Sequence, residues 1–507
     1  MQKNEQLGWV YFIIVLLGLT LLIRLIDEAQ LITHFPFGFT NDISSYIAQL
    51  HFMKTCGFHQ WCPYWYNGFV HLLVNQPGWY FFAYPLYLLF GNVLAATYAS
   101  MVILYLLGFV AIWILGKHLQ IDKIKRVAFY LLFFANAGII GNTLRNSRQH
   151  AMLTLVLLVF LFTLVWYYKD RPIRWPFFLT SVVYSFMIVT HYQETILAGL
   201  LFVSLLIYKR AWKERIAVVG AGILSVLLSL WWVKGFLTAL SSSSLLTFHE
   251  GARIFEWSKE VVLTNLFTFI IPAVFIVLWW YVKKIERKEH RDWIFFLPIA
   301  VLAILYFFRL TAFIPVIQNI SQDPYLSFFL FFLFVILFTY EEKLFSRPFV
   351  SALVRWGIIA VTIGSVLVSM FYTPFFERAH SLDEEIISLF PHVDGRMLFI
   401  SQLQDGEGLI SYNKPLYSYA AIYYGISTSA GWSPPVTNTP YLDRIDPLEK
   451  LLTRPDATCE QLKTELTFFN TANVITTLGT CDQLAACELK KLASTEHACL
   501  YSTSSSL

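Results

Sequence analysis

The sequence opens with a long apolar run, GWVYFIIVLLGLTLLIRLI, at residues 8–26. About 20 apolar residues are needed for a helix to cross the hydrocarbon core of a bilayer, so this run predicts a transmembrane helix. The run is longer than the apolar core of a signal peptide, and no small-x-small cleavage motif follows it. We therefore expect it to be retained as a signal anchor.

Similar runs continue to about residue 373, in a chain that is 57% hydrophobic and only 14% charged. Soluble domains carry about 25% charged residues, so lipid is the expected surroundings of this chain. The pattern predicts a polytopic α-helical membrane protein with about 11 transmembrane helices. These helices are expected at residues 8–26, 93–116, 127–141, 150–168, 175–190, 195–208, 216–234, 262–282, 293–308, 324–340 and 350–373.

The basic residues sort to one side when successive spans alternate in direction from a cytoplasmic N-terminus. The cytoplasmic loops then hold nineteen Lys and Arg residues, and the outer loops and outer span ends hold eight: Lys54, Arg145, Arg148, Arg253, Lys259, Arg309, Arg24 and Lys234. Positive residues favour the cytoplasmic side, so the C-terminal tail is expected to be extracytoplasmic. The formal net charge of +4 is spread over short loops, and no basic domain suggests a nucleic-acid partner.

Residues 27–92 form a long first outer loop between the first two spans. An amphipathic helix is expected at residues 43–54. The apolar stretch GWYFFAYPLYLLFG at residues 78–91 is short, and if it crossed the bilayer it would move the basic loop 117–126 to the outside. It therefore predicts an interfacial or re-entrant helix.

Residues 374–507 lack long apolar runs and predict a small extracytoplasmic α/β domain. Strands are expected at 396–401 and 473–478, and helices at 442–452 and 459–469. All six cysteines of the chain lie on the predicted outer side, which favours disulfides in an oxidising compartment over buried thiols. Neighbouring pairs would be Cys56 with Cys62, and the four tail cysteines among themselves; none has the spacing of a zinc site.

Ionisable residues are nearly absent from the predicted spans and instead gather at their outer ends. A transporter keeps charges deep in the membrane along its pathway, so this distribution favours a site at the outer interface that lipid-borne substrates can reach.

Three motifs of the first outer loop carry a resemblance to a known family. They are FGFTNDISSY at residues 37–46, WCPYWYNGF at 61–69 and YPLYLLFGN at 84–92. The layout resembles the GT-C superfamily of polytopic membrane glycosyltransferases, and looks similar to its prokaryotic members related to pyruvoyl-tetrahydropterin synthase. The acidic pair usual in this loop is reduced here to Asp42 beside Asn41.

The resemblance implies transfer of a sugar from a polyprenyl-phosphate donor to a lipid, glycan or protein acceptor at the extracytoplasmic face. Asp42 would act as the general base of an inverting reaction; alternatively, it only caps the helix that begins near residue 43. The resemblance leaves room for a divalent metal ion, although a single acidic residue gives it few ligands. No nucleotide-binding motif is found, which favours a lipid-phosphate donor.

Other candidates for substrate binding also lie at outer span ends. Arg145, Arg148 and Arg309 have the planar donor fork that suits phosphate, while head-group contact, pairing with acids or snorkelling are their alternatives. His191 and Glu194 suit proton transfer, metal binding or sugar contact, or form a structural pair.

The aromatic side chains of Trp61 and Tyr66 suit stacking on sugars or an interfacial belt. The outer loop at residues 249–256 is a candidate lid over the site. Two other function classes remain open from sequence: a flippase or transporter for lipid-linked sugar, and a non-catalytic membrane scaffold with a partner-binding outer domain.

Overall fold

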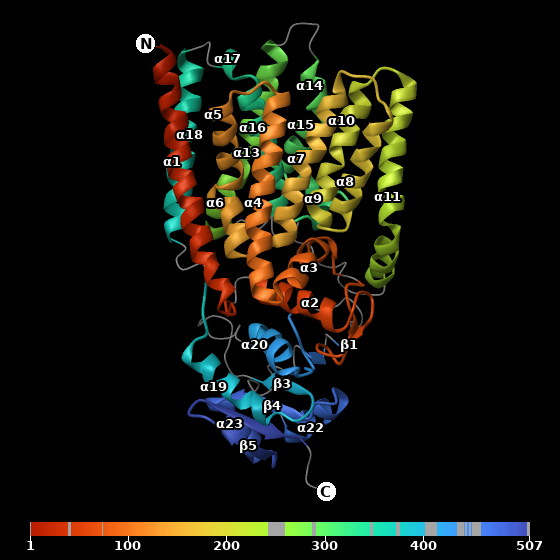
Figure 1. The fold of residues 1–507 in the computed structure, drawn as a ribbon, viewed down its shortest axis with the longest axis vertical. Helices are drawn as coiled ribbons and strands as arrows, with labels where there is room; N and C mark the ends of the chain where they lie inside the picture. The colour runs from red at the N-terminus through yellow and green to blue at the C-terminus, as the bar shows by residue number, and fades with distance from the viewer. Residues whose placement is uncertain are drawn as a thin grey trace.

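A computed structural model of the protein describes residues 2–38, 42–73, 75–241, 259–285, 291–344, 348–371, 376–400, 413–432, 441, 444–445, 448 and 458–503. These residues form a helical bundle and a small α/β domain that follow one another along the long axis (Figure 1). The N-terminus lies at one end of the bundle, and the C-terminal domain lies beyond the other end, which we call the domain side.

The long helices of the bundle are α1 (Gln2–Glu28), α4 (Val93–His118), α7 (Gln149–Lys169), α11 (Trp212–Ser241), α13 (Lys259–Ile285), α16 (Gln322–Thr339) and α18 (Pro348–Phe371). Among the described residues, six helices are long and apolar enough to cross a membrane, or seven if one bent pair counts as a span. That pair is α5 (Lys123–Phe134) with α6 (Ala137–Ile140) and η2 (Gly141–Arg145), bent by 50°. Each predicted span coincides with a helix or helix pair. These apolar helices show that the chain is an integral membrane protein. The number of eleven transmembrane helices stays a prediction.

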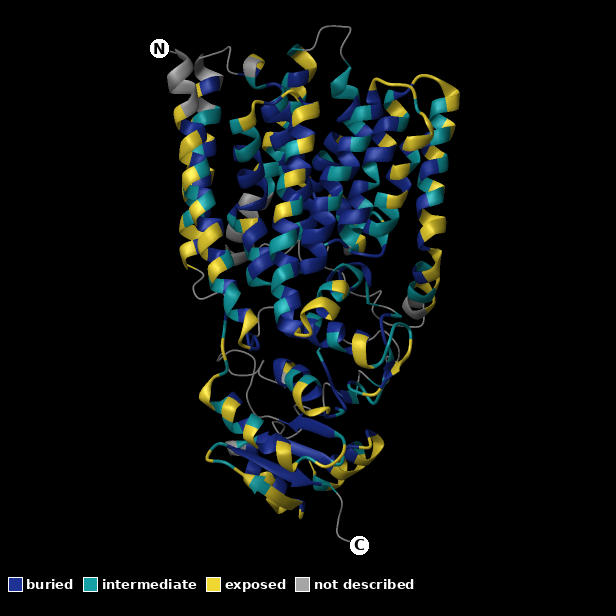
Figure 2. Ribbon diagram, viewed as in Figure 1, coloured by how far each residue is buried: buried dark blue, intermediate teal, exposed yellow. Residues whose placement is uncertain are grey.

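The other helices of the bundle are short and lie among the long ones. They are η3 (Trp175–Phe178), α8 (Leu179–Ile188), α9 (Tyr192–Ala198), α10 (Leu200–Tyr208), α14 (Asp292–Phe295), α15 (Leu297–Phe307) and α17 (Glu341–Leu344). Helix α7 is central: 72% of its apolar 18-residue stretch is buried, whereas the corresponding stretches of α1 and α18 are 39% and 17% buried. Many residues of the peripheral helices are exposed (Figure 2), as expected for a surface that lipid covers.

The first loop folds on the domain side of the bundle. It contains η1 (Ala29–Ile32), α2 (Ile43–Thr55), the two-stranded hairpin β1 (Trp61–Cys62) and β2 (Phe69–Val70), and α3 (Gly78–Phe90). Both helices expected in this loop are present. Helix α3 has 13 residues, too few to cross a bilayer, and packs against α4 and α7.

The C-terminal domain contains a four-stranded sheet in the order β3-β4-β6-β5. Strands β3 (Met397–Ile400) and β4 (Asn473–Thr477) are parallel, and β6 (Ala498–Ser502) is antiparallel to both β4 and β5 (Lys490–Ser494). Helices α19 (Ser381–Leu389), α20 (Asn413–Tyr419), α22 (Cys459–Phe468) and α23 (Leu478–Ala486) accompany it. The expected strands and the helix at 459–469 are confirmed; the prediction for 442–452 falls largely outside the described residues.

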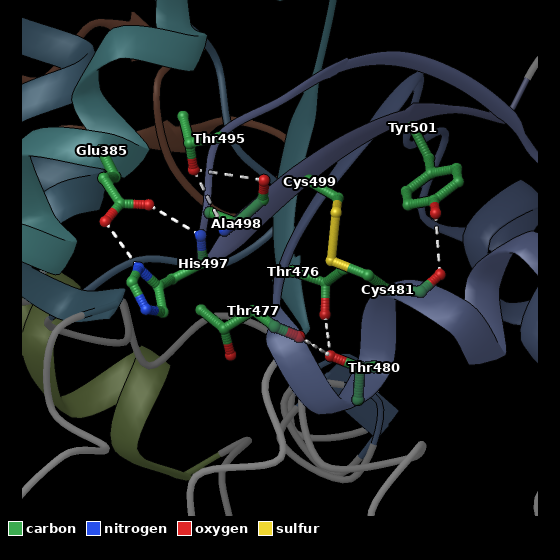
Figure 3. The surroundings of a disulfide bond; sticks show 10 residues. All are labelled: Glu385, Thr476, Thr477, Thr480, Cys481, Thr495, His497, Ala498, Cys499 and Tyr501. Carbon is green, nitrogen blue, oxygen red and sulfur yellow. Dashed lines mark hydrogen bonds and ion pairs between the residues drawn. A yellow bond between two sulfur atoms is a disulfide. The ribbon is translucent and has the colours of Figure 1, made fainter.

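All six cysteines form disulfides, as expected: Cys56 with Cys62, Cys459 with Cys487, and Cys481 with Cys499. Figure 3 shows the last of these, which ties α23 to β6. In the same view the Glu385 carboxylate accepts hydrogen bonds from the backbone N–H and from Nδ1 of His497, both at 2.8 Å, and so joins α19 to the start of β6.

At the end of the bundle away from the C-terminal domain, charges are buried in a closed cluster formed by Lys169, Asp292 and Tyr340. The Lys169 ammonium group is 5% exposed and pairs with Asp292, whose other carboxylate oxygen accepts a hydrogen bond from the Tyr340 hydroxyl at 2.7 Å. Trp166 covers the ammonium group, with its ring centroid 4.1 Å from Nζ. Such a satisfied cluster joins α7, α14 and α16 at the end of the bundle.

Candidate functional site

Asp42 lies at the start of α2 and faces the bundle. Its backbone N–H donates to the Asn146 carbonyl at 3.1 Å, and its side chain makes no capping hydrogen bond to α2. The alternative interpretation of Asp42 as a simple helix cap is therefore wrong. Its carboxylate instead accepts a hydrogen bond from the Trp432 indole at 3.2 Å and lies 3.9 Å from Arg148 Nε.

Arg148 joins two carboxylates that come from distant parts of the chain. Its Nη1 donates to Asp323 Oδ2 at 3.2 Å, while Nε faces Asp42. We call these three residues the open cluster, because their side chains are 42% (Asp42), 40% (Arg148) and 47% (Asp323) exposed. Ligands from outside therefore have access to the guanidinium group and to both acids.

The backbone before Arg148 explains how its side chain reaches Asp42. Asn136 lies in the break of the bent pair and caps α6 by accepting from the Ile139 N–H at 3.1 Å. A short π-helical turn, η2, follows, and then Ser147 adopts a φ of 51°, which is uncommon for a residue other than glycine. Both features turn the chain sharply into α7, and such local strain often accompanies functional sites.

His191 and Glu194 lie at the break between α8 and α9. Nδ1 of His191 is hydrogen-bonded to Glu194, so the pair expected from their spacing exists. His191 interacts electrostatically with Arg148 and His150, which places the pair beside the open cluster. Its part in proton transfer or sugar contact stays a prediction.

The start of α3 holds this break in place. The Gly78 N–H donates to the Val189 carbonyl at 2.9 Å, and a Cβ at Gly78 would lie 2.8 Å from Thr190 Cα, so only glycine fits there. Just before it, the Gln76 carbonyl accepts from His150 Nε2 at 2.9 Å. The first loop thus fixes the starts of both α7 and α9.

The two other arginine candidates lie around the open cluster. Arg145 ends η2, shortly before Arg148, and is half-buried. Arg309 follows α15 with a left-handed φ of 61°, is 8% exposed and stacks over the Phe269 ring at 5.0 Å. This low exposure favours contacts within the protein over snorkelling, and phosphate binding by Arg309 stays a prediction. Tyr306 interacts electrostatically with both Arg309 and Asp323 and links the arginine to the cluster.

The aromatic candidates of the first loop lie in and beside the hairpin. Trp61 is 62% exposed in β1. Tyr66 packs against the C-terminal domain, with its ring centroid 6.4 Å from that of Tyr441. The motif around Tyr66 therefore has a docking role that the sequence did not suggest, while sugar stacking by either residue stays a prediction.

Burial raises the pKa of the Asp42 carboxyl above its ordinary value, whereas Arg148, the Trp432 hydrogen bond and Lys414 lower it. Because the side chain remains 42% exposed, water screens part of these effects. A carboxylate with a raised pKa is a better proton acceptor than an unperturbed one while it is ionised. The environment therefore suits a general base.

The described residues do not fit a metal site. They contain no group of three or more His, Cys, Asp or Glu side chains that could hold a metal ion. Between Asp42 and Asp323 the structure has the Arg148 guanidinium instead. The candidate lid at 249–256 lies outside the described residues.

Two residues of the site were not predicted from the sequence. Asp323 stands just before a predicted span, where its position among acids at span ends was a usable signal. Trp432 is 390 residues away from its partner Asp42 and lies in a segment with no motif, so nothing local indicated its role.

The overall fold is similar to that of several solved membrane glycosyltransferases. The mycobacterial arabinofuranosyltransferase AftD aligns with a TM-score of 0.56 and 15% identity over 97% of this chain and 40% of AftD. ArnT from Cupriavidus metallidurans in the apo state gives 0.54 and 14%, over 99% and 98% of the two chains. The oligosaccharyltransferase AglB from Archaeoglobus fulgidus, in complex with an inhibitory peptide and a dolichol-phosphate, gives 0.54 and 10%, over 98% and 74%.

These similarities define the class of fold: the chain has the fold of GT-C glycosyltransferases. The chain spans 40% of the length of AftD. Comparison of the sequence with models of known protein families and with curated proteins finds no match. The narrower resemblance to proteins related to pyruvoyl-tetrahydropterin synthase is therefore not confirmed.

Proposed function

We propose that this protein is a membrane glycosyltransferase that moves a sugar from a polyprenyl-phosphate carrier to an acceptor hydroxyl at the extracytoplasmic face. The open cluster carries this proposal, since a carboxylate and a guanidinium group of the kind that suits phosphate lie side by side within reach of solvent. AglB has the same fold and was solved with a dolichol-phosphate, which supports a lipid-phosphate donor.

In the proposed reaction, the acceptor hydroxyl attacks the anomeric carbon of the donor while Asp42 takes the hydroxyl proton. A bond forms between the acceptor oxygen and the anomeric carbon, and the bond from that carbon to the phosphate oxygen breaks. The polyprenyl phosphate leaves with the electron pair and the added negative charge. Attack opposite the leaving group inverts the anomeric centre.

Arg148 stabilises the leaving phosphate, because a guanidinium group can donate to two oxygens at once. Two helix N-termini support it: α7 begins at Gln149, and α16 begins at Gln322 beside Asp323. The dipole of a helix favours negative charge at the N-terminus of that helix. When phosphate engages Arg148, the weak pairing with Asp42 is relieved and the carboxylate becomes available to the acceptor.

The test is an assay of sugar transfer and donor hydrolysis by the purified protein in nanodiscs, with a panel of polyprenyl-phosphate sugars and a parallel panel of nucleotide sugars. We expect turnover of a lipid-linked donor only, and a loss of at least 100-fold in Asp42→Asn, as for removal of a general base.

The matched control for this assay is Asp122→Asn. Asp122 lies at the opposite end of the bundle, is 80% exposed and pairs only loosely with Lys125 at 3.6 Å. Its substitution is expected to leave turnover unchanged. Equal activity of Asp42→Asn and wild type would exclude Asp42 as the base, and use of nucleotide sugars would overturn the assignment of the donor.

A further inference from the structure

We propose that the C-terminal domain contributes a residue to the active site, and that this residue, Trp432, positions Asp42. This inference rests on the proposed function, because it assigns a partner to its general base. The C-terminal domain then holds the base in its reactive orientation rather than only binding a partner protein.

The geometry at Asp42 shows what Trp432 does. An indole N–H is a donor only, and here it points at Oδ1 of Asp42 at 3.2 Å. Without such a donor, an aspartate that precedes a helix ordinarily turns back to accept from the first amides of that helix. Asp42 does not do so, and its second oxygen, Oδ2, faces Arg148 instead. Trp432 therefore keeps one oxygen occupied and leaves the other directed toward the guanidinium group.

The backbone that carries Trp432 is fixed between the two parts of the molecule. We call residues 427–432 the strap. On one side, the Met397 N–H donates to the Ser427 carbonyl at 3.0 Å, which attaches the strap to β3. On the other side, the Thr428 N–H donates to the Tyr64 carbonyl of the first loop at 2.7 Å. The strap is thus bonded to the C-terminal domain and to the loop that carries Asp42.

Gly431 allows the strap to come this close. A Cβ at Gly431 would lie 2.8 Å from Trp65 Cγ and 2.9 Å from Tyr66 Cε2, distances that a real side chain does not adopt. Trp65 is buried and cannot move aside. The absence of a side chain at Gly431 therefore brings its neighbour Trp432 to Asp42.

The charged and titratable groups that face Asp42 come from four other elements and from α2 itself. Arg148, at the start of α7, pairs with Asp42 and also with Asp323 of α16. The other groups are Lys414 of α20, Tyr80 of α3 and Tyr46 of α2. Among them Lys414 also belongs to the C-terminal domain, and its ammonium group lies 5.8 Å from the Trp432 ring centroid. The hydrogen bond from Trp432 stabilises the ionised carboxylate, so it lowers the pKa of Asp42.

The test is Trp432→Phe, which keeps an aromatic ring but removes the donor, with Trp175→Phe as the control. Trp175 is 83% exposed at the other end of the bundle. In Trp432→Phe, kcat at neutral pH should fall about tenfold, as expected for a lost hydrogen bond to a charged group. The acid limb of the pH profile should move upward, since the pKa of Asp42 rises, while KM for the donor stays unchanged. A lower activity with an unmoved profile would overturn the positioning role.

Gly431→Ala provides a second variant that leaves the donor itself intact. The added methyl group should displace the strap and reproduce the shift of the acid limb. A Gly431→Ala protein that retains its disulfides and elutes as a single species with the wild-type profile would contradict the proposed link between docking and the base.

An NMR measurement that does not depend on sugar transfer distinguishes this inference from the proposed function. The protein is labelled with 5-fluorotryptophan at position 432, and its ¹⁹F resonance is followed against pH. We expect the resonance to titrate in the wild type and to lose this titration in Asp42→Asn. A resonance that does not titrate overturns the inference, whereas titration in a protein that transfers no sugar supports the hydrogen bond and counts against the proposed function alone.

Discussion

Helix α7 carries a charged cluster at each of its ends, about 30 Å apart, and the two clusters differ in access to water. At one end, Lys169 is 5% and Asp292 16% exposed, Trp166 covers the ammonium group, and the exposed Asp170 pairs with Lys169 from the surface at 3.1 Å. At the other end, Arg148 and Asp323 are 40% and 47% exposed, and the pairing with Asp42 is long at 3.9 Å. A closed cluster joins helices, whereas an open one is free to exchange a partner for a ligand.

The backbone differs between the two ends in the same way. Helix α7 ends at Lys169 and runs into a short turn, while its start is reached through a bent helix pair, a π-turn and the left-handed Ser147. Irregular backbone inside a membrane protein is tolerated where it lines a polar site. We therefore propose that one end of α7 stabilises the bundle and that the other end carries the chemistry.

Apart from Asp42→Asn, the largest effect on activity is expected from Arg148→Ala. Removing a donor to the leaving phosphate should lower kcat by about 10²–10³-fold. The melting temperature should change little, because half-exposed ion pairs contribute about 0–1 kcal/mol. Steady-state transfer and thermal unfolding in the same nanodiscs measure both quantities, and a stable protein with undiminished transfer would contradict the role of Arg148.

Lys169→Met is the converse change at the closed cluster. It leaves Asp292 buried without its cation, and breaking such a pair costs about 3–5 kcal/mol of unfolding free energy. Transfer per folded molecule should stay within about twofold of wild type, because the site lies at the far end of α7. A strong loss of activity in the folded fraction would show that the two ends are coupled.

The pH dependence of transfer should report Asp42 directly. Burial raises its pKa, so the base becomes protonated and activity falls at a higher pH than for an ordinary aspartate. Below that pKa, kcat/KM should drop about tenfold per pH unit, because only the ionised form accepts a proton. An acid limb at or below the ordinary pKa of aspartate would mean that Arg148 and Trp432 outweigh burial.

Within the open cluster, the smallest effect on transfer is expected from Asp323→Asn. Asp323 orients Arg148 from the opposite side, and its exposed pairing contributes little energy, so transfer should fall only about fivefold. The loss should appear mainly in KM for the donor. A loss as large as that of Asp42→Asn would instead identify Asp323 as the base.

The sequence predicted the parts of this molecule that depend on local patterns. Apolar runs located the bundle helices, and the spacing of His191 and Glu194 indicated their pairing. Arg148 was a candidate because a guanidinium group at an outer span end suits phosphate.

Local sequence patterns did not predict the contacts between segments that are distant in the chain. The strap, the docking of Tyr66 on the C-terminal domain and the approach of Trp432 to Asp42 depend on the folded arrangement, in which residues 390 positions apart share a hydrogen bond. The break between α5 and α6 was likewise hidden within the predicted span 127–141, whereas η2 and the break between α8 and α9 coincide with predicted span ends.

The most direct test of the account is a cryo-EM structure of the protein in nanodiscs with a bound polyprenyl phosphate. If the open cluster binds the donor, we expect phosphate density about 3 Å from the Arg148 guanidinium group, with Asp42 still hydrogen-bonded to Trp432. A head group bound instead at the opposite end, beside Lys169, would contradict the assignment of the open cluster as the donor site.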